Sequence, residues 1–223
     1  RDLHLSLRRQ RQMCIRDRSY VKKIIAGFKE NILLSSAVKG VVRTPDGVMI
    51  YHNKDKDPIK FDKVIFATHS DQALALLKDP SDNELSILSA LPYQKNIAIL
   101  HTDNSLMPKI KTTWSSWNYF LSGDPSRPVT LTYNMNILQS LDAKPDFLVT
   151  LNSSGEIDPS KIIKKIEYHH PLFTVDGVNA QKKKNQISGQ NNTFYCGAYW
   201  GNGFHEDGVK SALDVCKNFG VSL

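Results

Sequence analysis

The sequence predicts an α/β (α+β) fold, because a strand is followed by a helix in two separate parts of the chain. Residues 61–67 form a nearly continuous apolar run typical of a strand, and an apolar helix stripe follows over residues 72–77. Residues 193–199 predict another strand, and residues 209–219 predict the helix after it. Continuous apolar strands are usually buried on both faces, so we expect this burial for the strand at residues 61–67.

Further elements are predicted between these two stretches. Pro45, Asp46 and Gly47 give a turn signal between strands at residues 32–42 and 48–52, which predicts a hairpin. Two further helices are expected, one at residues 84–90 and one opened by Asp158 and Pro159, in which Ile162, Ile163 and Ile166 share one face. Ser70 is expected to be the N-cap of the helix at 72–77. Strands are expected at 97–101, 129–136 and 147–151, an aromatic loop at 114–120, and an exposed loop at Lys182–Lys184.

The charge of the chain is concentrated at its beginning. The 223 residues carry a formal net charge of +7, and residues 1–18 hold six Arg against Asp2 and Asp17, a surplus of four. The remainder is therefore close to balanced, and we expect no nucleic-acid partner. No apolar run reaches the roughly 18 residues of a membrane span.

Residues 1–18 share no pattern with the rest of the chain. They resemble translated sequencing-adaptor sequence and are expected to be a non-native segment; the alternative is a native Arg-rich targeting arm. The segment has no apolar core of a secretory signal, and the three Cys show neither a disulfide framework nor zinc-ligand spacing. A cytoplasmic location and no metal site are therefore expected.

A glycine-rich turn separates the strand at 193–199 from the final helix. It contains Gly201, Gly203 and Gly208, and glycines let a backbone approach a ligand closely. A helix N-terminus adds unpaired N–H groups and positive potential, so the backbone at 204–206 is a candidate anion-binding segment. An ordinary strand-to-helix connection would have the same pattern.

The residues of this turn resemble a known motif. Phe194-Tyr-Cys-Gly197, followed by Gly203-Phe-His-Glu206-Asp-Gly, is similar to the C-terminal flavin motif of the flavin-containing amine oxidoreductase family. The resemblance implies FAD as cofactor. By this resemblance, Gly203 is the turn glycine and Phe204 lies beside the flavin ring. The backbone N–H of His205 faces the pyrimidine carbonyl of the flavin, and Glu206 is the acidic residue of the motif. Gly197 and Ala198 make further contacts with the cofactor. Ala198 stands where the family usually has an acidic residue.

One subgroup of that family resembles the chain over roughly residues 20–220. Its members are the predicted NAD/FAD-binding proteins associated with cyclopropane-fatty-acid synthases, in which an alanine at the position of Ala198 is usual. The similar stretches are Ala67-Thr-His-Ser-Asp-Gln-Ala-Leu, Leu100-His-Thr-Asp103, Trp114-x-x-Trp117-Asn-Tyr119, Leu131-Thr-Tyr-x-Met-Asn136, Tyr168-His-His-Pro171 and Cys196-Gly-Ala-Tyr.

The resemblance implies a fold and its division into domains. It implies part of an FAD-binding, Rossmann-like domain of the glutathione-reductase type at residues 19–92 and 176–223, and a mixed-sheet substrate domain at residues 93–175. Val38 would meet the adenine end of FAD, and Ala67 and Thr68 would lie near the diphosphate. The Gly-x-Gly-x-x-Gly fingerprint is absent from the sequence and is expected upstream, so the fragment itself is expected to be inactive.

The implied activity is oxidation of a substrate C–H by hydride transfer to the flavin, with an amine or a fatty-acyl compound as substrate. The alternative is a non-catalytic partner of a lipid-modifying methyltransferase. A small-molecule or lipid-derived substrate also leaves room for peripheral membrane association. Tyr199, Trp117 and Tyr119 are candidate pocket residues or plain core residues, and no side chain stands out as catalytic.

Overall fold

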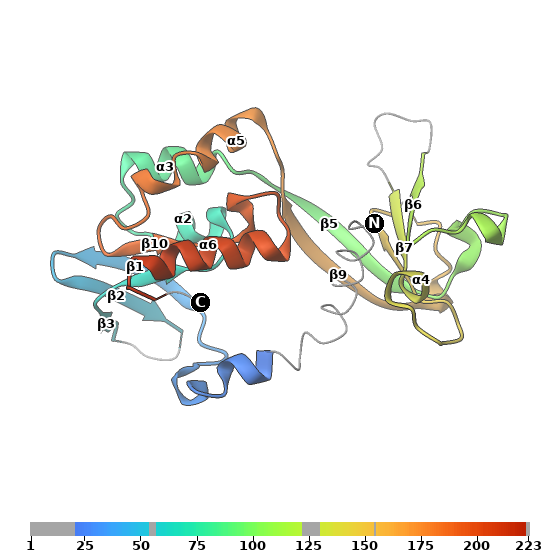
Figure 1. Cartoon of the computed structure of the whole chain (residues 1–223), viewed down its shortest axis with the longest axis horizontal. Coiled ribbons are helices and arrows are strands. Elements are labelled where there is room, and N and C mark those ends of the chain that lie inside the picture. Colours follow the sequence, from blue (N-terminus) through green and yellow to red (C-terminus); the bar gives the residue numbers. More distant parts are fainter. Residues whose placement is uncertain (1–20, 54–56, 122–129, 154, 222–223) are drawn as a thin grey trace. The chain divides into compact units, whose positions relative to one another are not determined.

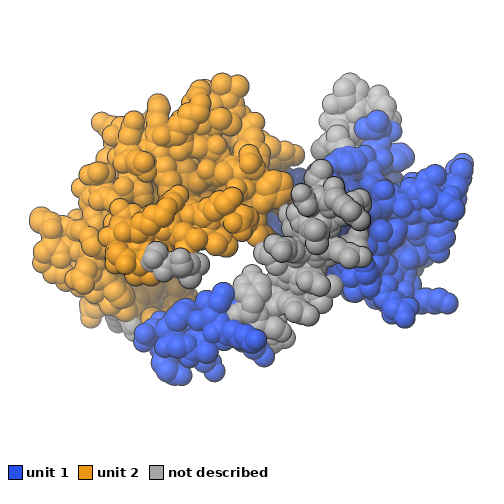
Figure 2. All heavy atoms as spheres, viewed as in Figure 1, with its two compact units in different colours: residues 1–32, 95–169 blue, residues 33–94, 170–223 orange. Residues whose placement is uncertain are grey.

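The computed structural model describes residues 21–53, 57–121, 130–153 and 155–221. The chain divides into two compact units, which Figure 2 shows in two colours. Unit 1 contains residues 1–32 and 95–169, and unit 2 contains residues 33–94 and 170–223. Each unit is described by itself. Residues 1–18, the adaptor-like segment, lie outside the described residues.

Unit 2 begins with an antiparallel sheet made of β1 (Val38–Thr44), β2 (Gly47–His52) and β3 (Ile59–Phe61) (Figure 1). The predicted hairpin is confirmed, because Thr44 pairs with Gly47 across the turn. Gly47 has a positive φ of 149°, and a Cβ at this position would lie 2.4 Å from the Phe61 carbonyl oxygen. Glycine is therefore required where the turn meets β3.

The second sheet of unit 2 is a parallel pair, β4 (Val64–Phe66) and β10 (Thr193–Tyr195). The strand predicted at residues 61–67 is shorter, and the prediction that it is buried on both faces is wrong, because Phe66 is buried but Ile65 is 47% exposed. The helices of this unit are α2 (Ser70–Leu76), α3 (Asp82–Ser89), α5 (Val175–Gln181) and α6 (His205–Lys217). The 3-10 turns of this unit are η5 (Lys184–Gln186) and η6 (Ala198–Trp200). The buried core of the unit includes Val41, Val48, Phe66, Ala73, Leu77, Ile87, Leu88, Ala180, Ile187 and Tyr195.

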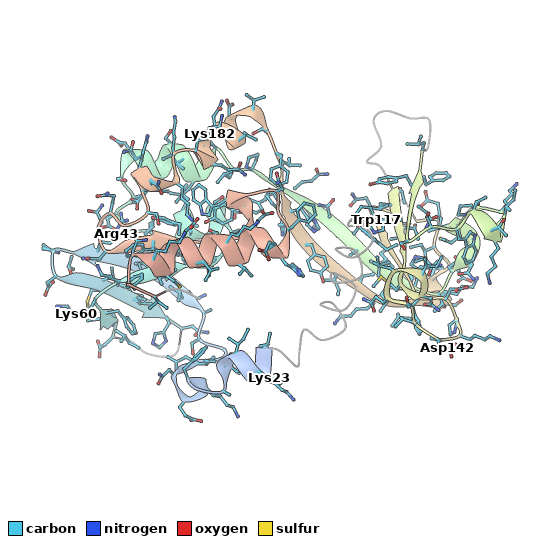
Figure 3. The ribbon with its side chains drawn as sticks, viewed as in Figure 1. Lys23, Arg43, Lys60, Trp117, Asp142 and Lys182 are labelled. Atoms are coloured by element: carbon cyan, nitrogen blue, oxygen red, sulfur yellow. The ribbon has the colours of Figure 1, made fainter. Side chains whose placement is uncertain are left out.

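A buried ion pair ties β1 to α3 in this core. The Arg43 guanidinium, labelled in Figure 3, lies between the carboxylates of Asp79 and Glu84. Its Nη1 is 2.6 Å from Glu84 Oε1, and both side chains are almost fully buried. Burial alone would raise the pKa of Glu84, but hydrogen bonds from Arg43, Tyr195 and Ser81 hold that pKa below its ordinary value.

A five-stranded sheet in the order β6-β7-β8-β5-β9 lies in unit 1, except for residues 93–94 of β5 and 170–171 of β9, which belong to unit 2. The strands are β5 (Tyr93–His101), β6 (Trp117–Phe120), β7 (Thr130–Asn134), β8 (Leu148–Leu151) and β9 (Ile162–Pro171). Pairing from β6 through β7 and β8 to β5 is antiparallel. The helical segments are η1 (Lys29–Asn31), η2 (Asn104–Leu106), η3 (Lys111–Thr113), α4 (Met135–Gln139) and η4 (Pro159–Lys161).

Several predicted elements differ from the structure. The helix expected after Asp158 and Pro159 is wrong, because only the turn η4 is helical and the isoleucines belong to β9. The strand expected at 129–136 ends at Asn134, whose side chain accepts a hydrogen bond from the Ile137 N–H and starts α4. The expected aromatic loop contains β6, and the strand expected at 193–199 ends at Tyr195. Ser70 is the first residue of α2, after the N-cap His69.

Within the described residues, no helix is both long enough and apolar enough to cross a membrane.

Candidate functional site

The candidate site lies where β4 and β10 end. These strands run parallel, and the Cys196 N–H continues their pairing by donating to the Phe66 carbonyl at 2.9 Å. Ala67 and Thr68 therefore follow one strand end, and Gly197 and Ala198 follow the neighbouring one. In open sheets of parallel strands, ligands bind in the crevice outside the carboxyl ends of the strands. The structure thus brings together two pairs of predicted site residues.

An apolar groove of about 580 Å³ runs beside β4. Val38, Ala67 and Thr68, all predicted to contact cofactor, lie on its wall. The rest of its lining is Val41, Ile50, Val64, Ile65, Phe66, Gln72, Ala75 and Leu76. Within the described residues, the backbone N–H and C=O of Ile65 make no hydrogen bond, since the pairing with β10 uses the groups of Val64 and Phe66. This side of β4 is therefore an open strand edge.

The turn after β10 is held by backbone hydrogen bonds to Ala198. Its carbonyl oxygen accepts from the N–H of Gly201 at 3.0 Å and from that of Gly203 at 3.1 Å. The Gln181 side chain in α5 donates 2.8 Å hydrogen bonds to the carbonyl oxygens of Tyr199 and Gly201. Sequence reasoning missed Gln181, because only the tertiary structure brings it to this turn.

Asp207 organises the start of α6. Its Oδ2 accepts hydrogen bonds from the N–H groups of Asn202 and Phe204, both at 3.0 Å. Glycine is needed at 201, because a Cβ there would lie 2.6 Å from the Asp207 carboxyl. Asp207 could have been predicted from the sequence as a residue that stabilises the helix start, since acidic residues are favoured in the first turn of a helix.

Two backbone N–H groups at the start of α6 are left without an acceptor. The N–H groups of Asp207 and Gly208 donate to the Phe204 carbonyl, whereas those of His205 and Glu206 have no hydrogen bond within the described part of the chain. Helix α6 runs for 13 residues, so its N-terminus presents positive potential together with these free donors. The arrangement suits an acceptor oxygen or a group that gains negative charge.

Gly203 and Phe204 form the outer part of the turn. Gly203 has a φ of +85°, and a Cβ there would lie 3.3 Å from the Phe173 ring. The Phe204 side chain is 57% exposed. The Phe173 ring therefore occupies the Cβ side of Gly203, whereas the Phe204 side chain is open to solvent. The side chains of His205 and Glu206 are exposed, and Glu206 lies 4.0 Å from Lys210 on the same helix.

Tyr199 lies beneath the turn. It is only 3% exposed, and its ring packs so closely on Gly197 that a Cβ there would lie 2.4 Å away. Among the described residues its hydroxyl finds no hydrogen-bond partner, and burial raises the pKa of Tyr199. The structure therefore gives Tyr199 a packing role under the backbone, and its part in a substrate pocket stays a prediction.

Lys184 was expected in an exposed loop, and this expectation is wrong. Its Nζ donates to the Ser211 Oγ at 3.2 Å, and the same Oγ accepts from the Gly197 N–H at 3.2 Å. The side chain is half-buried near the Trp200 ring. Burial lowers the pKa of Lys184. Lys184 and Ser211 thus fix the backbone of Gly197 from the side of α6.

The other candidate residues lie in unit 1. Trp117 and Tyr119 belong to β6, on the same face of that strand, and both are more than half exposed. His101 is fully buried; its Nε2 is 2.7 Å from the Thr150 Oγ1, and its Nδ1 accepts from the Asp103 N–H. It is a structural histidine. In the part of the chain that the structure describes, no cluster of His, Cys, Asp and Glu could hold a metal ion.

Comparison with known proteins gives a likeness of fold. No family model and no curated protein matches the sequence. Many solved structures match in fold, and three of them illustrate the likeness. The CLA-producing fatty acid isomerase from P. acnes has a TM-score of 0.57 and 15% identity, and the match covers 83% of this chain and 48% of that one. Cyclohexylamine oxidase from Brevibacterium oxydans has a TM-score of 0.57 and 11% identity over 88% of this chain and 51% of that one, and putrescine oxidase bound to putrescine has a TM-score of 0.58 and 10% identity over 88% and 51%.

This chain resembles part of the flavin amine-oxidase fold. The likeness is to the mixed α/β architecture, because the sequence identities are too low to carry more. The chain spans about half the length of the structures it matches.

Proposed function

We propose that the chain is part of an FAD-dependent oxidoreductase, with the flavin ring beside the turn between β10 and α6. The observation that carries this proposal is the pair of free N–H groups of His205 and Glu206 at the start of a 13-residue helix. The resemblance of this turn to the flavin motif and the likeness to amine-oxidase structures support the same cofactor.

The residues present fit a flavin. The free N–H groups of His205 and Glu206 suit a carbonyl oxygen of its pyrimidine, and Gly203 gives the turn before them a positive φ of 85°. Val38, Ala67 and Thr68 would hold the nucleotide portion of FAD in the groove beside β4. Ala198 contributes its backbone, because its carbonyl fixes the N–H groups of Gly201 and Gly203. An acidic side chain is not needed for that task.

Bound flavin would supply the redox chemistry by accepting a hydride from a substrate C–H. The residues of this chain orient the ring and tune its charge. The N–H groups of His205 and Glu206 and the dipole of α6 would stabilise negative charge growing on the ring during reduction. Phe204 would shield one edge from water, and Gln181 with Asp207 would hold the turn rigid.

The substrate belongs to one of two classes. The matched structures include an oxidase bound to putrescine and a fatty acid isomerase. We propose an amine or a fatty-acyl compound, acted on in the cytoplasm. In a longer protein that carries this sequence and retains flavin, substrate-dependent bleaching of the flavin absorbance would identify an enzyme. Flavin that no substrate bleaches would favour a non-catalytic partner.

Amide resonances test the proposed flavin contact on this chain directly. Titration of the ¹⁵N-labelled chain with riboflavin should shift the backbone amides of His205 and Glu206 most strongly. The amide of Gly155, in unit 1, serves as the control and should not move. Uniform small shifts, or none at the start of α6, would remove this turn from the flavin site.

A further inference from the structure

The turn between β10 and α6 contains the one Asn-Gly pair of the sequence, Asn202-Gly203. In such a pair the backbone nitrogen of the glycine can attack the side-chain carbonyl carbon of the asparagine and close a five-membered ring. Glycine hinders this attack least, because it has no Cβ beside the nitrogen. Each of the other asparagines is followed by a residue that carries a side chain.

The side chain that would be attacked is free. Asn202 is exposed, and within the described residues its side-chain amide makes no hydrogen bond. It can therefore rotate toward the nitrogen of Gly203 without losing a contact. Asn218, near the end of α6, differs in this respect, since its side-chain amide donates to the carbonyl oxygens of Asp214 and Val215.

The attacking nitrogen is held by one hydrogen bond. The Gly203 N–H donates to the Ala198 carbonyl at 3.1 Å, and this proton must leave before the nitrogen can attack. Asp207 keeps the turn closed around that bond, because its carboxylate accepts from the N–H groups of Asn202 and Phe204. Local opening of the turn therefore controls how often the nitrogen is available.

We propose that Asn202 is a site of spontaneous deamidation, and that closure of its turn sets the rate. The Gly203 nitrogen loses its proton and bonds to Asn202 Cγ, while the Cγ–Nδ2 bond breaks and the amide nitrogen leaves with that proton as ammonia. Water then opens the succinimide ring at either of its two carbonyl carbons. The products are aspartate and isoaspartate, and in isoaspartate the main chain runs through the former side chain.

Both products would change the start of α6. Either one adds a negative charge three residues before His205, which offsets the positive potential of the helix N-terminus. Isoaspartate also lengthens the main chain by one atom between the N–H groups of Asn202 and Gly203, which are anchored to Asp207 and Ala198. These two hydrogen bonds cannot both keep their geometry. Weaker flavin binding as a consequence rests on the proposed function, whereas the modification itself does not.

Peptide mapping by mass spectrometry tests the proposal on the full chain without flavin. The chain is incubated at pH 8 and 37 °C, and the replacement of the side-chain NH₂ by OH is followed at each asparagine. Asn202 should react at least about fivefold faster than Asn185, which is also exposed with a free side chain but is followed by Gln186. Equal rates, or a faster reaction at Asn185, would overturn the proposal.

A variant of the turn tests its control of the rate. Asp207→Ala removes the two hydrogen bonds that close the turn, and it should raise the rate at Asn202 at least about threefold. Asp214→Ala, at an exposed position on the same helix, is the control and should leave the rate unchanged. An unchanged rate in Asp207→Ala would overturn the role given to the turn.

The riboflavin titration measures the consequence. In the incubated chain, the shifts at His205 and Glu206 should shrink in proportion to the aspartate and isoaspartate formed. Asn202→Gln, whose longer side chain would have to close a larger ring, should keep its shifts after the same incubation. Full shifts in a completely modified chain would overturn the proposed effect on flavin binding. A fresh chain without shifts would count against the flavin proposal alone, because the mass measurement does not depend on flavin.

Discussion

The hydroxyl of Tyr195 in β10 donates a 2.6 Å hydrogen bond to the carboxylate of Glu84 in α3, 111 residues away in the sequence. The same carboxylate receives the Arg43 guanidinium and the Ser81 N–H. Every oxygen of Glu84 is therefore occupied, which is what a buried charge requires. This carboxylate joins β1, α3 and β10, the elements that position the candidate flavin site.

We expect Tyr195→Phe to lower the free energy of unfolding of unit 2 by about 1–3 kcal/mol, because a buried hydrogen bond to a charged group is lost. Arg43→Met should cost more, roughly 3–5 kcal/mol, since it leaves the Glu84 carboxylate without its cation. Urea unfolding followed by far-UV circular dichroism measures both. The control is Asp46→Asn in the exposed pair with Lys60, which should leave the unfolding midpoint unchanged. A smaller loss in Arg43→Met than in Tyr195→Phe would contradict this account.

The stability of unit 1 should fall as the pH falls, in two steps. Burial keeps the pKa of His101 below its ordinary value, although the Asp103 charge acts the other way. The unfolded chain therefore binds a proton below pH about 6.5 that the folded chain excludes. The pKa of Asp103 is also lowered, chiefly by the hydrogen bond from the Asp158 N–H, against its burial. Its contribution is complete above about pH 4 and is lost below that.

Amide exchange of β7 and β8 as a function of pH, corrected for intrinsic rates, measures both steps. His101→Gln should remove the step that begins near pH 6.5, and Asp103→Asn should remove the step that begins near pH 4. Tyr168→Phe, at an exposed position on β9, is the control variant and should leave both steps unchanged. Stability that stays flat from pH 7 to pH 3 would show that neither group is coupled to folding.

Local signals in the sequence were sufficient for some elements and misleading for others. The hairpin of β1 and β2 follows from Pro45 and Gly47, because the turn chemistry lies within three residues. The isoleucines at 162, 163 and 166 fit a helix stripe equally well, yet they form β9 because β5 is available to pair with them. That pairing is a long-range property, and it overrides local periodicity.

In the candidate site, too, some residues could be predicted from the local sequence and others could not. Gly203, Phe204 and His205 could be singled out from the turn pattern and the family resemblance, which lie in a few consecutive residues. Gln181 and Lys184 could not, because each reaches the turn from a different element through packing. Ser211 likewise meets Gly197 only because α6 folds back on β10. Residues that support a site from elsewhere in the chain leave no local pattern.

Asp207→Ala should loosen the start of α6. The substitution removes two hydrogen bonds, to the N–H groups of Asn202 and Phe204, and loss of such a cap costs about 0.5–2 kcal/mol of helix stability. Faster amide exchange in the first turns of α6 and smaller riboflavin-induced shifts at His205 and Glu206 are the expected results. Asp214→Ala, at an exposed position further along the same helix, should change neither. Similar effects from the two variants would mean that Asp207 has no special role.

Gly203→Val tests the turn in a longer protein that carries this sequence and retains flavin. The valine would occupy a backbone with φ +85° and bring a Cβ within 3.3 Å of the Phe173 ring. Strain of this kind costs roughly 1–3 kcal/mol. FAD affinity should fall about tenfold or more, since each 1.4 kcal/mol corresponds to about one decade in the dissociation constant.

Gly155→Val is the matched control for backbone strain. Gly155 also has a positive φ, 103°, but a Cβ there meets no atom within 4 Å, and the residue belongs to unit 1. Its replacement should impose similar strain and leave FAD affinity nearly unchanged. Equal losses at the two positions, measured by equilibrium dialysis, would mean that the effect is general destabilisation. An unchanged affinity in Gly203→Val would show that the flavin does not approach this turn.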